Sequence, residues 1–472
     1  MTLLIDKYSA VKVLSNITIC IWGFLIGANF YFVVAMIILL DMIISCIRKI
    51  ENYAFLFAFG IAFFIFLMGR DFLENFFRYK VELHYSTEIN NHAYICMILA
   101  LVSIWGAYWL FSEKIKIKFN QHVNRSSQQI SSRYIDYIQQ ISKLFFYTTI
   151  PFAIASRLAI VRFVGNNSYT EYYTDYSELL VGNTALYIVS KIELAMPVAL
   201  CIFLATYPTK KDSKKILIVY FIYLLISLGA GSRGPFVLGI LLLLVFFVTM
   251  QGIRPEEKWF SRRYLLVLLL LVPVAAVSGY MYNLARFGIS NESTSLLDAF
   301  TGFFYDQGVT VTVIKRAYQF ADQIPEQGLY TLEFVHSGII ARLLGIPVYN
   351  GNSINHAMHG GSFTHAIGYV IMGQGYLAGR GTGSSYIAEL YYDFGYIGVV
   401  IGSFIYGVIF SKLTEKDSQS VLSRAIVFAL MTQFLWAPRG GFSAFLSYLL
   451  APSTIFVFIV TFGMAKMLDK YK

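Results

Sequence analysis

The sequence predicts an all-α protein with about twelve transmembrane helices, on the grounds of its composition, its apolar segments and its basic connections. Of its 472 residues, 57% are hydrophobic and only 14% are charged, too few to cover the surface of a water-soluble protein of this length. The hydrophobic residues form repeated runs of about 17 to 25 residues, each matching one helical crossing of a bilayer. These runs do not alternate polar and apolar residues, as the strands of a membrane β-barrel would.

Apolar segments follow one another along the whole chain and set the order of the predicted helices. They lie near 10–28, 30–46, 54–69, 93–112, 142–164, 182–206, 216–230, 235–250, 264–282, 393–411, 421–437 and 443–465. The connection after every second segment is rich in Lys and Arg, as in KKDSKK at 210–215. Because cytoplasmic loops collect these residues, both termini are predicted to be cytoplasmic, which is also the parity that twelve spans require. The N-terminus lacks the pattern of a cleavable signal, so the first segment is predicted to be retained.

One outer connection, at 283–392, is much longer than the others and divides the chain. Nine helices are predicted at 1–282 and three at 393–472, with this loop region between them. Two amphipathic stretches inside it, at 296–320 and 332–345, are predicted to form short helices on the membrane face or over a cavity. Long structured loops are usually functional. The chain shows no internal repeat, which weakens the hypothesis of a transporter built from two related halves.

The net charge of +10 does not by itself indicate a nucleic-acid partner. Lys and Arg collected in cytoplasmic loops explain it, and we expect no nucleic-acid binding. The cysteines lie in apolar segments without the spacing of a metal site, so they are interpreted as inert packing residues. They are Cys20, Cys46, Cys96 and Cys201.

Basic residues differ in type between the two predicted sides of the membrane. Lys predominates in the connections assigned to the cytoplasm, and Arg predominates outside. Arg presents a planar fork of donors that grips a phosphate with two bonds, whereas Lys offers a point charge. The outer arginines therefore suggest an anion at the outer leaflet, such as a lipid phosphate or pyrophosphate; for several of them, snorkelling toward headgroups is the alternative. They are Arg70, Arg78, Arg157, Arg162, Arg233, Arg286, Arg316, Arg342, Arg380 and Arg439.

The dipeptide Arg-Gly occurs three times, each time outside and at or shortly before the start of a predicted helix. Glycine lets a backbone approach a ligand closely, and a helix start presents unpaired N–H groups to an anion. Pro235 suits the first turn of the helix that follows the first of these turns. Tight hairpins capped by arginine are the alternative interpretation. The turns are Arg233-Gly234 in GAGSRGPF, together with Gly231, then Arg380-Gly381 in AGRGTGSS and Arg439-Gly440 in APRGGF.

Carboxylates that could act as a general base are scarce on the outer side. Glu389 and Asp393 are four residues apart and are predicted to share a helix face just after the second Arg-Gly turn. A carboxylate beside a sugar hydroxyl can remove its proton. The alternative is a pair of solvated charges at a helix entry. Asp306, Asp322 and Glu333 are weaker candidates in the same loop.

Two further groups of polar residues carry weaker signals. His356, His359 and His365 are loosely spaced and have no carboxylate or cysteine nearby, so we predict no metal site and expect hydrogen bonding to substrate or loop packing. Lys191 lies inside an apolar segment close to Glu193, which suggests an intramembrane ion pair or a substrate contact.

Four short motifs lie mostly in the second half of the chain. They are GAGSRGPF at 229–236, YNLARFG at 282–288, GTGSSYIAELYYDFGYIGVVIG at 381–402 and WAPRGGF at 436–442. In the order and predicted side of these motifs, and in hydropathy along its whole length, the chain resembles one family, the Wzy-type O-antigen polysaccharide polymerases.

The resemblance implies a glycosyltransferase of the bacterial inner membrane that works at the periplasmic face. It would move a growing chain from undecaprenyl pyrophosphate to the non-reducing end of the next lipid-linked repeat unit. The pyrophosphate-facing residues would then be Arg233, Arg286, Arg380 and Arg439, with Glu389 as the candidate base. No cofactor, nucleotide-sugar site or metal is expected, and a chain-length regulator is a candidate partner.

Two other functions fit parts of the same pattern. An O-antigen ligase shares the many spans and the large outer loop but would transfer the chain to lipid A core. A flippase for lipid-linked oligosaccharides, or another transporter of about twelve spans, belongs to a different class. A flippase needs charged residues along a path through both leaflets, whereas the unusual charges here gather outside, which favours chemistry over transport.

Overall fold

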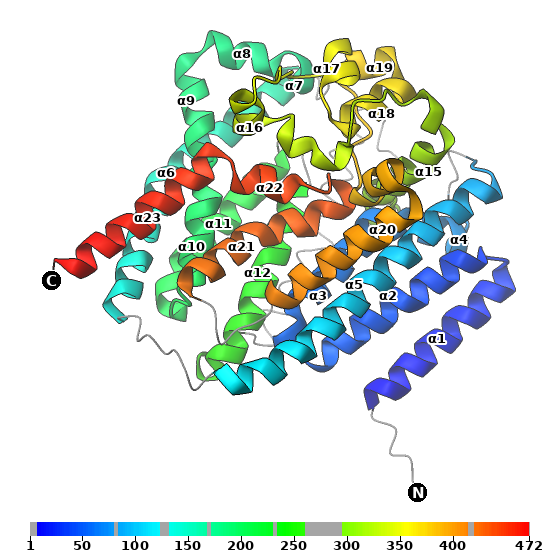
Figure 1. Ribbon diagram of the computed structural model, residues 1–472, viewed down its shortest axis with the longest axis horizontal. Helices are drawn as coiled ribbons and strands as arrows, with labels where there is room; N and C mark the ends of the chain where they lie inside the picture. The colour runs from blue at the N-terminus through cyan, green and yellow to red at the C-terminus, as the bar shows by residue number, and fades with distance from the viewer. Residues whose placement is uncertain are drawn as a thin grey trace, which may run out of the picture.

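The computed structural model describes residues 7–79, 84–122, 132–167, 171–229, 234–259, 295–413 and 420–471, and over these ranges it contains helices and no strands (Figure 1). The long helices are α1 (Lys7–Ile26), α2 (Phe30–Arg48), α3 (Ile50–Phe63), α5 (Thr87–His122), α6 (Ser132–Asn166), α9 (Thr184–Glu193), α10 (Ala195–Ala205), α11 (Lys210–Gly229), α12 (Gly234–Ile253), α20 (Tyr386–Leu413), α21 (Val421–Trp436) and α23 (Pro452–Lys470).

Shorter helices connect the long ones. The α-helical pieces are α4 (Gly69–Phe77), α7 (Glu171–Thr174), α8 (Tyr176–Gly182), α14 (Leu296–Gln307), α15 (Val311–Gln319), α16 (Gly338–Leu343), α17 (Ile354–His359), α18 (Phe363–Met372), α19 (Gln374–Leu377) and α22 (Ala444–Leu449). A π-helical turn, η1 (Phe64–Met68), joins α3 to α4. The 3-10 turns are η2 (Pro255–Glu257), η3 (Gly308–Thr310), η4 (Ala321–Gln323), η5 (Tyr330–Val335) and η6 (Ala437–Arg439).

Ten helical segments of the described residues are long and apolar enough to cross a membrane. Each coincides with one of the twelve predicted segments, so the protein is a multi-pass membrane protein. The predicted span at 216–230 falls in α11, which is not among the ten; α11 begins with the charged run KKDSKK. The predicted span at 264–282 lies outside the described residues. The count of twelve therefore stays a prediction.

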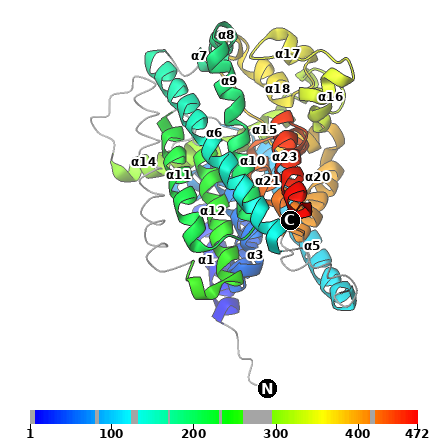
Figure 2. The same cartoon turned by 90° about the vertical axis from the view of Figure 1, so that its left-hand side faces the viewer.

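The short helices gather toward one end of the bundle. Figures 1 and 2 both show α7, α8 and the group from α16 to α19 at this end, whereas α1 begins near the opposite end. The two amphipathic stretches predicted inside 283–392 do form short helices, namely α14 and α15 in the first and η5 and α16 in the second. Helix α20 begins at Tyr386, so the last residues of that predicted loop already belong to a helix.

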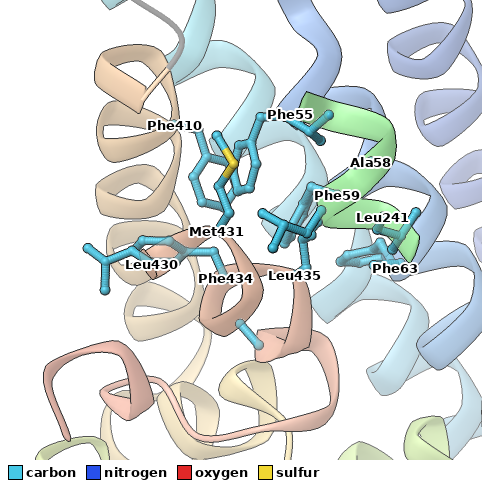
Figure 3. Close-up of a cluster of buried hydrophobic side chains, with 14 of the residues drawn as sticks. Phe55, Ala58, Phe59, Phe63, Leu241, Phe410, Leu430, Met431, Phe434 and Leu435 are labelled. Carbon is cyan, nitrogen blue, oxygen red and sulfur yellow. The ribbon is translucent and has the colours of Figure 1, made fainter. Parts of the chain in front are cut away.

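The bundle is held together by close contact between large apolar side chains of helices that are far apart in sequence. Figure 3 shows part of this core, with residues of α3, α12, α20 and α21 around Phe59 and Phe434. The ring of Phe410 lies 4.9 Å from that of Phe59 and 5.4 Å from that of Phe434, centroid to centroid. Because lipid tails are as apolar as these side chains, van der Waals packing rather than exclusion of water stabilises such contacts inside a membrane.

Glycines let α20 pack closely against α5 and bend near its start. A Cβ atom on Gly407 would lie 2.4 Å from the carbonyl oxygen of Ile104 and 2.8 Å from the Cβ of Ala107. Gly395 has φ of 63° and ψ of −157°, a conformation essentially restricted to glycine, and it breaks α20 after its first turns. The break separates a short first piece, which carries Glu389 and Asp393 and is called the outer piece after its predicted side, from the longer piece that follows.

Candidate active site

The candidate site lies where the outer piece of α20 meets the turn between α21 and α22. Glu389 is in the first turn of α20 and is completely buried. The hydroxyl of Ser384 donates a hydrogen bond of 2.7 Å to its Oε1, and the backbone N–H of Phe442 donates one of 2.7 Å to its Oε2. These donors stabilise negative charge on the carboxylate. The bond from Phe442 also joins the motif GTGSSYIAELYYDFG to the motif WAPRGGF.

A second carboxylate, that of Glu333, reaches the same place from η5. A Cβ atom on Gly441 would lie 3.0 Å from Oε1 of Glu389 and 3.2 Å from Oε2 of Glu333. Two carboxylates therefore approach one point on the backbone of the Arg-Gly turn, and only glycine leaves room for both. Burial raises the pKa of Glu333, while a hydrogen bond from Ser362 acts in the opposite direction.

Asp393, the other predicted base, binds the first residues of η5, in the long connection between α12 and α20. Its Oδ2 accepts hydrogen bonds of 2.8 Å from both the backbone N–H and the hydroxyl of Thr331, and its Oδ1 accepts one of 3.3 Å from the N–H of Tyr330. These are the first residues of η5. The two carboxylates therefore bind different segments. Glu389 binds the turn that follows Arg439, and Asp393 binds η5.

Arg439 ends the 3-10 turn η6, directly before the two glycines. One of its terminal nitrogens donates to the backbone carbonyl of Gln307 at 3.2 Å and lies 3.5 Å from the side-chain oxygen of the same residue. Its guanidinium carbon lies 5.7 Å from the ring centre of Trp436 and 6.0 Å from that of Phe66. The arginine is therefore held between the end of α14 and two aromatic rings.

Two of the three Arg-Gly turns meet at the indole of Trp436. A Cβ atom on Gly234 would lie 2.6 Å from this ring, and one on Gly440 would lie 2.7 Å from it. Close packing on the indole accounts for both glycines, which the sequence suggested as backbone anion sites. Helix α12 begins at Gly234 with Pro235 in its first turn, as expected. Phe66, in edge contact with the same indole, belongs to the π-helical turn η1, a local geometry that often marks functional sites.

The remaining predicted anion-binding residues are placed differently. Arg380 is exposed, and within the part of the chain that the structure describes its side chain makes no hydrogen bond or ion pair. Its backbone carbonyl accepts a bond of 2.9 Å from the amide of Asn352. A Cβ atom on Gly381 would meet nothing within 4 Å, so its backbone is open to a ligand. The residues Gly231, Arg233 and Arg286 lie outside the described residues.

Two other outer arginines do not snorkel toward headgroups. Arg70 is 5% exposed and binds Glu74 at 3.2 Å. Arg157 pairs with the buried Glu193 at 2.6 Å. The suggested ion pair between Lys191 and Glu193 is therefore wrong, because Glu193 is turned to Arg157 and the amine of Lys191 lies over a tyrosine ring of its own helix.

The predicted histidine group separates into a stacked pair and one exposed residue. The rings of His356 and His365 lie 3.6 Å apart, centroid to centroid, and His365 Nδ1 is 2.8 Å from the hydroxyl of Tyr376. Burial, and the charge of His356, lower the pKa of His365 to about 3; burial also lowers the pKa of His356. His359 is exposed. Over the described ranges no three His, Cys, Asp or Glu side chains gather in a way that could hold a metal ion.

Several residues at the site carried little or no signal in the sequence. Glu333 is only a weak candidate in the sequence, and Ser384 and Trp436 lie inside motifs in which the arginine and the carboxylates are the residues with an evident chemical role. Gln307 has no local signal, because its partner Arg439 lies 132 residues further along the chain. The second glycine of WAPRGGF is the feature that could have pointed to two acceptors crowding one backbone position.

Comparison with known proteins gives one decisive match. The sequence model of the family described as O-antigen polysaccharide polymerase Wzy matches residues 10–472, nearly the whole chain. The chain belongs to the O-antigen polysaccharide polymerase family. No curated protein and no solved structure matches it.

Proposed function

We propose that the protein polymerises lipid-linked oligosaccharide repeat units into O-antigen or a related surface polysaccharide. The donor would be the growing chain on undecaprenyl pyrophosphate, and the acceptor a hydroxyl of the next lipid-linked unit at the periplasmic face. Membership of the polymerase family supports the reaction class. The observation that carries the proposed site is the buried carboxylate of Glu389, bonded to the backbone of the turn that bears Arg439.

The proposed chemistry assigns one task to each charged group. Glu389 takes the proton of the acceptor hydroxyl as its oxygen forms a bond to the anomeric carbon of the donor. The bond between that carbon and the pyrophosphate oxygen breaks, and its electron pair leaves with the pyrophosphate. Arg439, together with Arg233, Arg286 and Arg380, stabilises the negative charge of this leaving group.

Deletion of the gene, followed by electrophoresis of the envelope polysaccharide, tests the function. A polymerase predicts that single repeat units remain attached to the lipopolysaccharide and that long chains disappear. A ligase predicts that no unit is attached, with long chains accumulating on the lipid carrier. A flippase predicts that units stay on the cytoplasmic leaflet. Only the first result, reversed by the wild-type gene, supports the proposal.

A further inference from the structure

Glu333, which the proposed function leaves without a task, stands directly beside the proposed base. It is brought there by η5, a 3-10 turn of the long outer region, whereas Glu389 belongs to α20. Both carboxylates lie within 3.3 Å of the position that a Cβ atom would take on Gly441. Two carboxylates this close in a buried site do not both carry full negative charge, because like charges repel strongly where water is excluded.

The donors around the pair indicate where the charge resides. Glu389 receives one hydrogen bond from Ser384 and one from the Phe442 N–H, both of 2.7 Å, and these favour negative charge on it. Burial opposes charge on both carboxylates, but within the described part of the chain Glu333 receives a hydrogen bond from Ser362 alone, so the proton of the pair is held more firmly by Glu333. Next to Ser384, the hydroxyl of Ser385 is buried and has no hydrogen-bond partner among the described residues, an independent sign that the start of α20 is built to face a polar group.

The position of Glu333 depends on Asp393. Three hydrogen bonds tie the first two residues of η5 to this carboxylate, one helical turn beyond Glu389 on α20. Tyr330, the first residue of η5, is 1% exposed and packs edge-on against Phe363. The outer region is therefore fastened to the same short piece of α20 that carries the proposed base.

We propose that Glu333 is the second carboxylate of the site, holding a proton that it shares with Glu389, and that Asp393 is the positioning residue that places it there. This inference rests on the proposed function. When the pair holds one proton, Glu389 is free to accept the proton of the acceptor hydroxyl. When the pair loses that proton, it carries two negative charges and opposes the binding of an anionic pyrophosphate donor.

Two other titratable groups of the described residues interact with the pair. They are Asp393 and Tyr406, both on α20. Asp393 adds negative charge beside the pair and therefore, like the second carboxylate, opposes the loss of the shared proton. Arg439 of the neighbouring turn η6 is the cation that the pyrophosphate would meet.

The test is a kinetic comparison as a function of pH, using the purified full-length protein in liposomes with lipid-pyrophosphate-linked repeat units. In the wild type, KM for the donor should rise with pH as the pair loses its last proton. Glu333→Gln should lower kcat, by about tenfold, and should remove that rise in KM, because a neutral amide cannot ionise. Glu326→Gln, the same change at an exposed glutamate of the outer region, should retain the wild-type pH profile.

A double-mutant cycle tests the positioning role. If Asp393 acts through Glu333, then Asp393→Asn should lower kcat in the wild type but change it by less than about twofold in the Glu333→Gln background, because coupled residues are not additive. An unchanged KM profile in Glu333→Gln, or multiplicative effects in the cycle, would overturn the inference. Failure of the wild-type protein to elongate the units at all would instead refute the proposed function.

Discussion

A methyl group added at Gly441 tests whether the site depends on the close approach of its two carboxylates. In Gly441→Ala the new Cβ would stand 3.0 Å from one oxygen of Glu389 and 3.2 Å from one of Glu333, so one carboxylate must move. We expect polymer length to fall sharply, with polymerisation lowered at least about tenfold because general-base catalysis depends on position. The measurement is the polysaccharide gel of a complemented deletion strain, with protein level checked by immunoblot.

Gly106→Ala provides the matched control for this substitution. Gly106 lies on an exposed face of helix α5, outside the candidate site, and a Cβ atom there would meet nothing within 4 Å. This variant should make long polymer. Equal losses in the two variants would show that the effect at Gly441 does not come from crowding of the carboxylates.

A substitution of Arg439 tests the proposal that this residue binds the pyrophosphate. Arg439→Lys keeps the charge but loses the planar fork that binds phosphate with two bonds, and it loses the contact with the carbonyl of Gln307. We expect short polymer at normal protein level, whereas Arg162→Lys at an exposed position should behave as the wild type. Normal banding from Arg439→Lys would contradict the role given to this residue.

At the scale of elements, a buried ion pair fastens the outer helices to the bundle. Lys315 of α15 lies 2.7 Å from Asp71 of α4, with side chains 3% and 1% exposed. Lys315→Met would leave the aspartate buried without its partner, at a cost of about 3–5 kcal/mol in the free energy of unfolding. Thermal unfolding in detergent should show a large fall in Tm. Arg254→Met, which breaks the more exposed pair with Glu257, should cost less than about 1 kcal/mol.

The stacked histidines make the outer helices sensitive to acid. His365 has a pKa of about 3 in the folded protein, below its ordinary value of about 6.5, so the unfolded segment binds more protons between these values. Stability of this region should therefore be complete above about pH 6.5 and fall as pH decreases, by at most about 1.4 kcal/mol per pH unit. Limited proteolysis as a function of pH should show the onset of cleavage in the wild type, and a weaker pH dependence in His365→Gln.

The elements could be predicted from the sequence more fully than their contacts. Apolar length alone located ten spanning segments, since each must satisfy its own backbone in lipid. The pairing of Glu193 with Arg157 rather than Lys191 could not be predicted, because it depends on which helix packs alongside. The same holds for Glu333 and Gln307, whose partners lie far along the chain, whereas Glu389 and Arg439 stood in recognisable motifs.

For the whole molecule, the sidedness of the bundle follows from its charges and stays a prediction. Lys-rich connections on one side place both termini in the cytoplasm and the short helices around α16 to α19 in the periplasm. Reporter fusions that are active on only one side of the membrane check this. Fusions at either terminus should report the cytoplasm, and one inserted near Asn350 should report the periplasm; the opposite pattern would place the candidate site on the wrong side for the proposed donor.

The most direct measurement is elongation of lipid-pyrophosphate-linked repeat units by the purified protein in liposomes, for the wild type and for Glu389→Gln. We predict that the wild type forms a ladder of longer lipid-linked chains, and that the variant, which keeps the fold but cannot take up a proton, forms about a hundredfold less product. Equal ladders from both proteins would contradict the role of Glu389 as the base that drives polymerisation.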